Sequence, residues 1–233
     1  MKLMVRGLLG GVVQAGLLAV LLLIPAGLVP GGTWTWTRGL AFVGVYFLLL
    51  EVAIVVMARL APASLEARMT KPASDTQPFA DRIATSLILL SSALLLIFVP
   101  FDVFYLRLFP APTPPVSGIG GALAVAGFAI IVTAIYQNAF ALPYVEDQTD
   151  RGQTLVDTGL YGFVRHPLYM GILPYLIGTC LWLESFAAVI VAVLPVAALV
   201  ARIAVEEKTL RETLPGYVEY TERVRYRMIP LVW

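Results

Sequence analysis

Residues 168–201 read LYMGILPYLIGTCLWLESFAAVIVAVLPVAALVA and contain two apolar runs joined by a Glu-Ser pair. The runs, Leu168–Leu183 and Phe186–Ala201, have 16 residues each. A helix of that length spans about 24 Å, slightly less than the hydrocarbon thickness of about 30 Å. We therefore predict a tight helical hairpin that returns the chain to the depth where it began. Pro174 and Pro195 should kink or shorten its helices, because each removes a backbone donor.

The composition of the whole chain is that of a membrane protein. Its 233 residues are 59% hydrophobic and 13% charged, with a mean hydropathy of +0.86. Globular proteins are about 45–50% apolar and about 25% charged. Four further runs are long enough to span a bilayer: Gly7–Val29, Gly39–Ala58, Ile83–Val99 and Gly118–Phe140. We predict an all-α integral membrane protein with about six transmembrane helices, the last two forming the hairpin.

The sequence after the hairpin predicts one more helix. Tyr217, Tyr220 and Val224 recur at helical spacing, which is typical of an amphipathic helix at a membrane surface. We divide the chain into an N-terminal four-span region, residues 1–141, and a C-terminal region, residues 142–233, that holds the hairpin and this terminal helix.

The distribution of basic residues predicts the orientation. With six spans and both termini on one side, that side receives 14 of the 16 Lys and Arg residues, and only Arg38 and Arg107 fall on the other. The positive-inside bias then makes both termini, and the terminal helix, cytoplasmic. A bacterial inner membrane is the expected location. The 14 residues are Lys2, Arg6, Arg59, Arg68, Lys71, Arg82, Arg151, Arg165, Arg202, Lys208, Arg211, Arg223, Arg225 and Arg227.

Several classes of function are disfavoured. The net charge of +1 and the absence of a basic run with interleaved aromatics give no argument for nucleic acid. The chain has one cysteine, Cys180, and one histidine, His166, so we expect neither an intrachain disulfide nor a metal site. We infer no obligate protein partner.

Two polar motifs lie at the ends of the hairpin. Residues 159–171 read GLYGFVRHPLYMG and hold the sole histidine, and residues 206–210 read EEKTL. A Tyr and Arg-rich segment, LPGYVEYTERVRYRMIP, follows at 214–230. Because helices of equal length return to the same depth, we expect the Arg165-His166 and Glu206-Glu207 pairs to form one site at the cytoplasmic surface.

These motifs resemble the signature of the isoprenylcysteine carboxyl methyltransferase and phospholipid methyltransferase superfamily, over roughly the last third of the chain. The resemblance implies an integral membrane enzyme that uses S-adenosyl-L-methionine, and a lipid-like acceptor that enters between helices. It implies that residues 142–233 bind the cofactor. The cofactor-binding residues it implies are Tyr161, Arg165, His166, Pro167, Tyr169, Gly171, Glu206 and Glu207.

The acceptor determines which side chains are catalytic. A carboxylate of an isoprenylcysteine-type substrate needs no base, but an arginine could hold both of its oxygens, and Arg202, Arg225 and Arg227 are candidates. An amine of a phosphatidylethanolamine-type lipid must first lose a proton, to Glu206 or Glu207. We assign the catalytic roles to Glu207, Arg202 and Arg227, and expect residues 59–82 to shape the choice of acceptor.

Structural roles and other functions stay open. Arg165 and Arg227 could anchor the chain at the membrane edge, and Gly171 could serve helix packing instead of the cofactor. Glu51, near Gln14 in the predicted spans, could be a protonated structural group or part of a substrate site. An NADPH-dependent membrane reductase and a small transporter are the remaining alternatives, in that order.

The orientation can be tested by labelling. In a Cys180→Ser background, single cysteines at positions 38, 107 and 184 should react with an impermeant reagent added to intact cells, because these positions fall on the side with few basic residues. A cysteine at position 208 should react only after the cells are opened. The reverse labelling pattern would show that the protein has the opposite orientation in the membrane.

Overall fold

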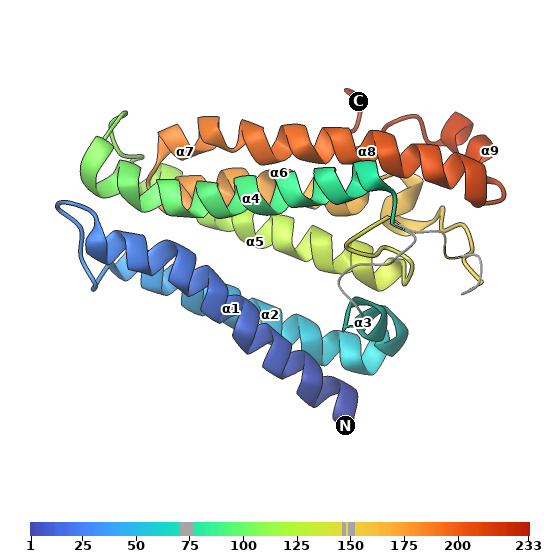
Figure 1. Ribbon diagram of the computed structural model, residues 1–233, viewed down its shortest axis with the longest axis horizontal. Helices are drawn as coiled ribbons and strands as arrows, with labels where there is room; N and C mark the ends of the chain where they lie inside the picture. Colours follow the sequence, from blue (N-terminus) through green and yellow to red (C-terminus); the bar gives the residue numbers. More distant parts are fainter. Residues whose placement is uncertain (70–76, 146–147, 149–151) are drawn as a thin grey trace.

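The computed structural model describes residues 1–69, 77–145, 148 and 152–233, and helices are the regular structure found there (Figure 1). The helices are α1 (Lys2–Leu28), α2 (Thr37–Leu60), α3 (Pro62–Met69), α4 (Phe79–Phe101), α5 (Pro114–Gln137), α6 (Pro167–Trp182), α7 (Phe186–Val191), α8 (Val193–Thr213) and α9 (Tyr217–Arg223). A π-helical turn, η1 (Asp102–Leu106), extends α4, and a 3-10 turn, η3 (Gly159–Gly162), precedes α6.

The all-α membrane fold is confirmed. In the described part of the chain, five helical segments are long and apolar enough to cross a bilayer: Lys2–Leu28, Thr37–Leu60, Phe79–Leu106, Pro114–Gln137 and Phe186–Thr213. The shorter apolar helix α6, with 16 residues, completes the expected set of six. Many large apolar side chains on the outer faces of these helices are exposed, as a lipid environment requires.

The hairpin differs from the prediction in its second arm. That arm was expected to end at Ala201, but α8 continues to Thr213, so Glu206 and Glu207 lie on the helix and not after it. The continuation RIAVEEKTLRET is rich in good helix formers, which propagate a helix beyond the apolar run. The arms are therefore unequal in length.

The prolines act differently in the two arms. Pro174 lies inside an uninterrupted α6, whereas the second arm breaks at Ala192 between α7 and α8. Pro195 cannot donate to the Val191 carbonyl, so the break falls where that hydrogen bond is missing. The expected kink is confirmed at Pro195.

Glycines bring α5 and α6 into close contact. A Cβ added at Gly127 would lie 2.5 Å from the Tyr175 amide nitrogen, and one at Gly178 would lie 2.4 Å from that of Ala124. Backbones this close require residues without side chains, as in small-residue helix pairs of membranes. Gly171 belongs to this contact, because its added Cβ would lie 2.8 Å from the Gly127 carbonyl oxygen. Packing of α8 against α4, and of α1 against α2, completes the bundle.

The hairpin turn is fixed at the opposite end of the molecule from α9 (Figure 1). Ser185 caps α7 by accepting from the Ala188 amide at 2.9 Å, and its hydroxyl donates to Asp102 at 2.6 Å. Arg38 pairs with Glu184 at 3.0 Å, so two positions predicted to share one side of the membrane lie together. Which side that is stays a prediction.

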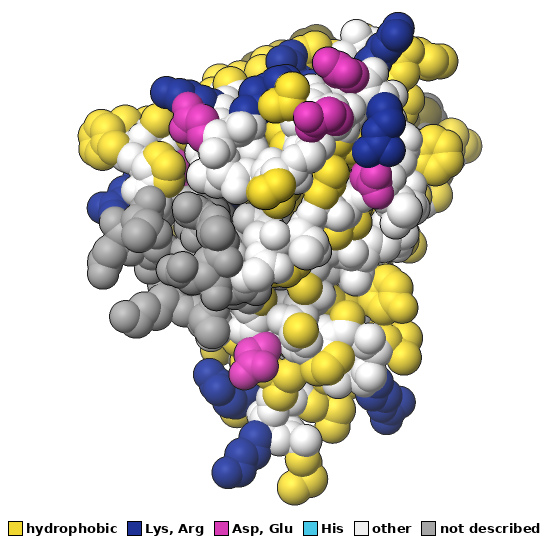
Figure 2. Space-filling model, turned by 90° about the vertical axis from the view of Figure 1, so that its right-hand side faces the viewer, with side chains coloured by type: hydrophobic (Ala, Val, Ile, Leu, Met, Phe, Trp, Pro, Cys, Tyr) yellow, Lys and Arg dark blue, Asp and Glu magenta, His cyan; other side chains and the backbone are white. Residues whose placement is uncertain are grey.

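Charged side chains gather at the other end. Figure 2 views the molecule from the side that carries α3 and α9, and Lys, Arg, Asp and Glu side chains lie across it. Of the basic residues assigned to this end, Lys71 and Arg151 lie outside the described residues. The division at residue 141 also stays a prediction.

The contact between α5 and α6 can be tested with one methyl group. Gly127→Ala should destabilise the protein by about 1–3 kcal/mol, because the added atom overlaps the backbone of α6. Gly118→Ala, on the same helix with open space around it, is the control and should leave the thermal unfolding midpoint in detergent unchanged or slightly higher. Equal midpoints for the two variants would contradict the packing.

Candidate active site

A polar pocket lies between the start of α6 and the last turns of α8. Its walls also include the end of α5, the connector after it and α9. Of the eight predicted cofactor-binding residues, six line it: Tyr161, Arg165, His166, Pro167, Tyr169 and Glu206. The structure thus brings together two motifs about 40 residues apart in sequence. Gly171 is not among the lining residues, since it packs against α5.

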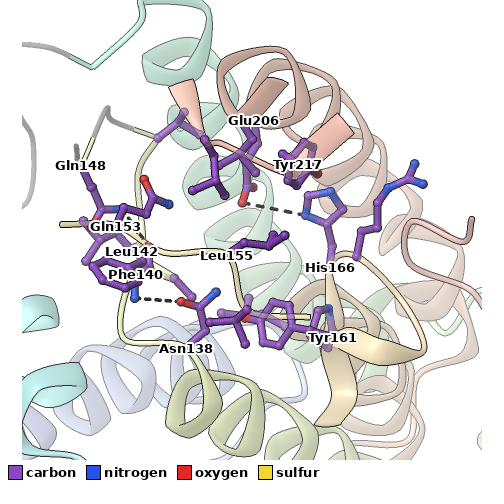
Figure 3. A pocket seen from close by; sticks show the side chains of 18 of the residues that line it. Asn138, Phe140, Leu142, Gln148, Gln153, Leu155, Tyr161, His166, Glu206 and Tyr217 are labelled. Atoms are coloured by element: carbon purple, nitrogen blue, oxygen red, sulfur yellow. Dashed lines mark hydrogen bonds and ion pairs between the residues drawn. The ribbon is translucent and has the colours of Figure 1, made fainter. Parts of the chain in front are cut away.

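His166 and Glu206 face each other in the pocket (Figure 3). His166 Nδ1 lies 3.8 Å from Glu206 Oε1. The hydroxyl of Tyr169 donates to Glu206 Oε2 at 2.7 Å, and the Tyr169 ring stacks on His166 with centroids 5.5 Å apart. Glu206 therefore presents a carboxylate to the pocket with its side chain 27% exposed, and the hydrogen bond from the Tyr169 hydroxyl positions it.

Glu207 has a different environment from its neighbour. Its side chain is 5% exposed, and its Oε1 accepts from Arg165 Nε at 2.7 Å and lies 3.4 Å from His166 Nε2. Its Oε2 accepts from Arg227 Nε at 3.1 Å. A buried carboxylate requires such partners. Both oxygens are engaged, so Glu207 ties three segments of the chain together.

The segment after α9 is fastened by the same residues. Arg165 Nη1 donates to the carbonyl oxygens of Val224 and Arg225 at 2.9 and 3.0 Å. The backbone amides of Arg165 and His166 donate to the carbonyls of Tyr226 and Arg227 at 2.9 and 2.8 Å. The Arg165 side chain is therefore buried in a structural network and does not extend to the membrane edge.

The arginines chosen as catalytic candidates also have partners. Arg202 forms a buried ion pair with Asp81, with 3.2 Å between Nε and Oδ1. Arg227 forms an ion pair with Glu207, and its guanidinium carbon lies over the Trp233 ring, 5.2 Å from the ring centroid. Arg225 is exposed and does not line the pocket. Of these three, Arg202 alone lines the pocket, and it does so while paired.

Two tyrosines on α9, Tyr217 and Tyr220, were expected on an amphipathic helix at a membrane surface, and the structure places both in the pocket wall. Tyr220 donates to the Tyr161 carbonyl at 2.7 Å. The Tyr217 hydroxyl is buried and has no hydrogen-bond partner among the described residues. Buried hydroxyls are normally satisfied, so this group points to a ligand or an ordered water.

The phenols at the pocket stay protonated near neutral pH. Burial raises the pKa of Tyr161, Tyr217 and Tyr220, and the nearby Glu207 carboxylate raises that of Tyr217 and Tyr220 further. They can donate hydrogen bonds or present a ring face, but none is a base at neutral pH.

Other lining residues were missed in the sequence. Asn138, Gln148 and Gln153 lie in or beside the connector between α5 and α6, which lacks any periodic pattern (Figure 3). Gln148 donates to the Phe140 carbonyl at 2.9 Å. Asp81 was likewise missed as the partner of Arg202. The signal for it, an acid in the first turn of a helix, is too common to be informative.

The described residues contain no group of three or more His, Cys, Asp or Glu side chains arranged to hold a metal ion. The pocket encloses about 90 Å³. Sites for small molecules usually have about 300–1,000 Å³. A nucleoside-sized ligand would therefore require this pocket to widen.

Comparison with known proteins supports the family resemblance. The family model for phospholipid methyltransferases matches residues 116–215, which run from α5 to the end of α8 and include both polar motifs. This confirms the resemblance at the level of the integral membrane methyltransferase superfamily. No curated protein matches the chain significantly.

The structural role of Glu207 can be tested against a neighbour on the same helix. Glu207→Ala leaves two arginines without their carboxylate and should destabilise the protein by about 3–5 kcal/mol. Limited proteolysis should then cut after α9, since this segment loses its anchor. Glu212→Ala, at an exposed site on α8, should behave as wild type. Equal stability of the two variants would refute the role.

Proposed function

We propose that this member of the integral membrane methyltransferase superfamily transfers a methyl group from S-adenosyl-L-methionine to a lipid-like acceptor. The observation that carries the proposal is the buried, unpartnered Tyr217 hydroxyl in a pocket that also presents Glu206 and His166. Three groups able to bind a charged, polar ligand converge there. His166 and Glu206 lie within the residues matched by the family model, and Tyr217 follows shortly after them. The pocket lies at the polar end of the bundle. If that end is cytoplasmic, as the basic residues predict, the pocket is accessible to a methyl donor from the cytoplasm.

The residues present fit this cofactor chemically. When bound, S-adenosyl-L-methionine supplies an electrophilic methyl group on a positively charged sulfur. The Glu206 carboxylate suits a cationic sulfonium or ammonium group, and aromatic faces such as Tyr161 attract cations as well. His166 and the Tyr217 hydroxyl can donate to a carboxylate. Glu207 would act indirectly, by holding Arg165 and the histidine in place.

Methyl transfer asks mainly for positioning from the protein. Well-oriented reactants can gain about 7–11 kcal/mol from proximity and alignment. With a carboxylate acceptor, S-adenosyl-L-methionine would supply the methyl group and leave as its neutral thioether. The pocket residues would then have to align the two reactants, and no side chain would have to take up a proton. A site walled by α6, α8 and α9 excludes water from this step.

An isoprenylcysteine-type carboxylate is the acceptor we favour, and a phosphatidylethanolamine-type amine is the second candidate. The amine must give up a proton before it attacks. Glu206 is then the base, because both oxygens of Glu207 already accept from arginines. A reductase or a transporter has no comparable support from the family match.

Cofactor binding can be measured by calorimetry on the purified protein. Glu206→Gln and His166→Ala should each weaken the affinity for S-adenosyl-L-methionine at least about tenfold, or 1.4 kcal/mol, because each removes a polar pocket group. Tyr217→Phe, which deletes only the unpartnered hydroxyl, should weaken it less and leave stability intact. Glu212→Gln is the control. Unchanged affinity in all three pocket variants would refute the site.

A further inference from the structure

A large, mainly apolar cavity lies beside the polar pocket, between the helices that are long and apolar enough to span a membrane. It encloses about 580 Å³, which is within the usual range for small-molecule sites. Its walls come from α1 and α2 on one side and from α4, α5, α6 and α8 on the other. In Figure 1 the α1 and α2 pair diverges from the remaining helices toward the α3 end. We call this cavity the chamber.

The chamber and the polar pocket follow one another along three helices. On each helix, a residue that lines the chamber lies three positions from one that lines the pocket. The pairs are Ile135 on α5 with Asn138, the residue directly after that helix, Ile172 and Tyr169 on α6, and Leu199 and Arg202 on α8. Three residues correspond to about 4.5 Å along a helix, so one elongated molecule could occupy both spaces.

Arg68 stands at this junction. It lies on α3, lines the chamber and donates to the Ala141 carbonyl in the connector that walls the pocket. Burial lowers the pKa of its guanidinium to about 10, the phenols of Tyr161 and Tyr169 act in the opposite direction, and the Arg202 charge lowers it further. The group remains charged at neutral pH, close to two tyrosines of the pocket.

Arg68 differs from the other arginines that are at least partly buried. Within the described residues, five arginines including Arg68 are at least partly buried, and the other four each pair with a carboxylate. The pairs are Arg38 with Glu184, Arg165 with Glu207, Arg202 with Asp81 and Arg227 with Glu207. In the described part of the chain, Arg68 has no carboxylate within ion-pair distance, and its hydrogen-bond partner there, the Ala141 carbonyl, uses only part of its five N–H donors.

We propose that Arg68 binds the anionic group of the methyl acceptor while the apolar chain of the acceptor fills the chamber. The inference rests on the proposed function and narrows it to an amphiphile that carries a negative charge next to its apolar part. A guanidinium holds a carboxylate or a phosphate through two parallel hydrogen bonds. Arg68 would then bind the acceptor carboxylate, a role expected of Arg202 or Arg227, which instead pair with carboxylates of the protein.

The charge can be tested by direct binding, without cofactor, using two matched pairs of probes. N-acetyl-S-farnesylcysteine and its carboxamide differ only in the carboxylate. Lysophosphatidylethanolamine and the monoacylglycerol of equal chain length differ in the phosphoethanolamine group. Wild-type protein in detergent should prefer the member that carries the carboxylate or the phosphate in one pair at least about tenfold. Arg68→Gln should reduce that preference to about twofold or less. Arg59→Gln, an exposed arginine at the end of α2, should keep it.

The pair that responds identifies the source of the charge. Loss of preference in the first pair assigns a carboxylate to Arg68, and loss in the second assigns a phosphate. No preference in wild type, or a preference that Arg68→Gln retains, overturns the proposal. Arg68→Lys replaces the glutamine variant if that variant fails to fold. It should keep part of the preference, because lysine keeps the positive charge but cannot donate two parallel hydrogen bonds as a guanidinium does.

The chamber has its own test on α1. Gly10 lines the chamber and Gly16 does not, and an added Cβ meets no atom within 4 Å at either position. Gly10→Leu should weaken binding of the long-chain probes severalfold by occupying chamber volume. Gly16→Leu is the matched control and should bind as wild type. Equal effects of the two substitutions would contradict binding of the probe's apolar chain in the chamber.

These results separate the inference from the proposed function. Arg68 does not line the polar pocket, so Arg68→Gln should bind S-adenosyl-L-methionine with wild-type affinity. Wild-type protein that binds no cofactor but discriminates the probes would contradict the methyltransferase proposal alone. Normal cofactor binding without probe discrimination would contradict the role of Arg68 alone.

Discussion

The carboxylate of Glu207 is the group on which the arrangement of the polar end depends. It is buried, it accepts from two arginines, and those arginines reach the start of α6 and the segment after α9. Without it, the buried charge of Arg165 and the partly exposed charge of Arg227 would lose their counter-charge, and leaving Arg165 unpaired is far more costly than losing a surface ion pair. The pocket exists because three segments distant in sequence are held around one carboxylate.

Adjacent glutamates have separate roles because of helix geometry. Successive residues on an α-helix point about 100° apart, so Glu206 and Glu207 cannot share an environment. Glu206 reaches the pocket and accepts from Tyr169, whereas Glu207 faces the arginines. A motif read as one functional unit thus divides into one residue that faces the pocket and one that supports it.

The membrane helices could be predicted from sequence because apolar runs of fixed length have few alternatives in a bilayer. For the site, the sequence predicted that the hairpin brings Arg165-His166 and Glu206-Glu207 to the same end of the bundle. The end of α8 was not, since its charged continuation leaves the apolar signal but retains helix propensity. The pairing of Arg202 with Asp81 was not predictable either, because many acids could have been its partner. Connector residues such as Asn138 carry no periodicity at all.

The glycine contact makes α5 and α6 behave as a single stiff unit, whereas α1 and α2 meet the rest of the bundle across an open chamber. The family match begins in α5 and excludes α1–α4. The molecule thus combines a half in which the contact between α5 and α6 leaves no room for an added methyl group with a half that lines a large cavity. Under the proposed function, a change in the tilt or the side chains of α1 and α2 would alter which acceptors are accepted while the donor half stayed fixed. Such a chain could diversify its substrates by remodelling its first two helices alone.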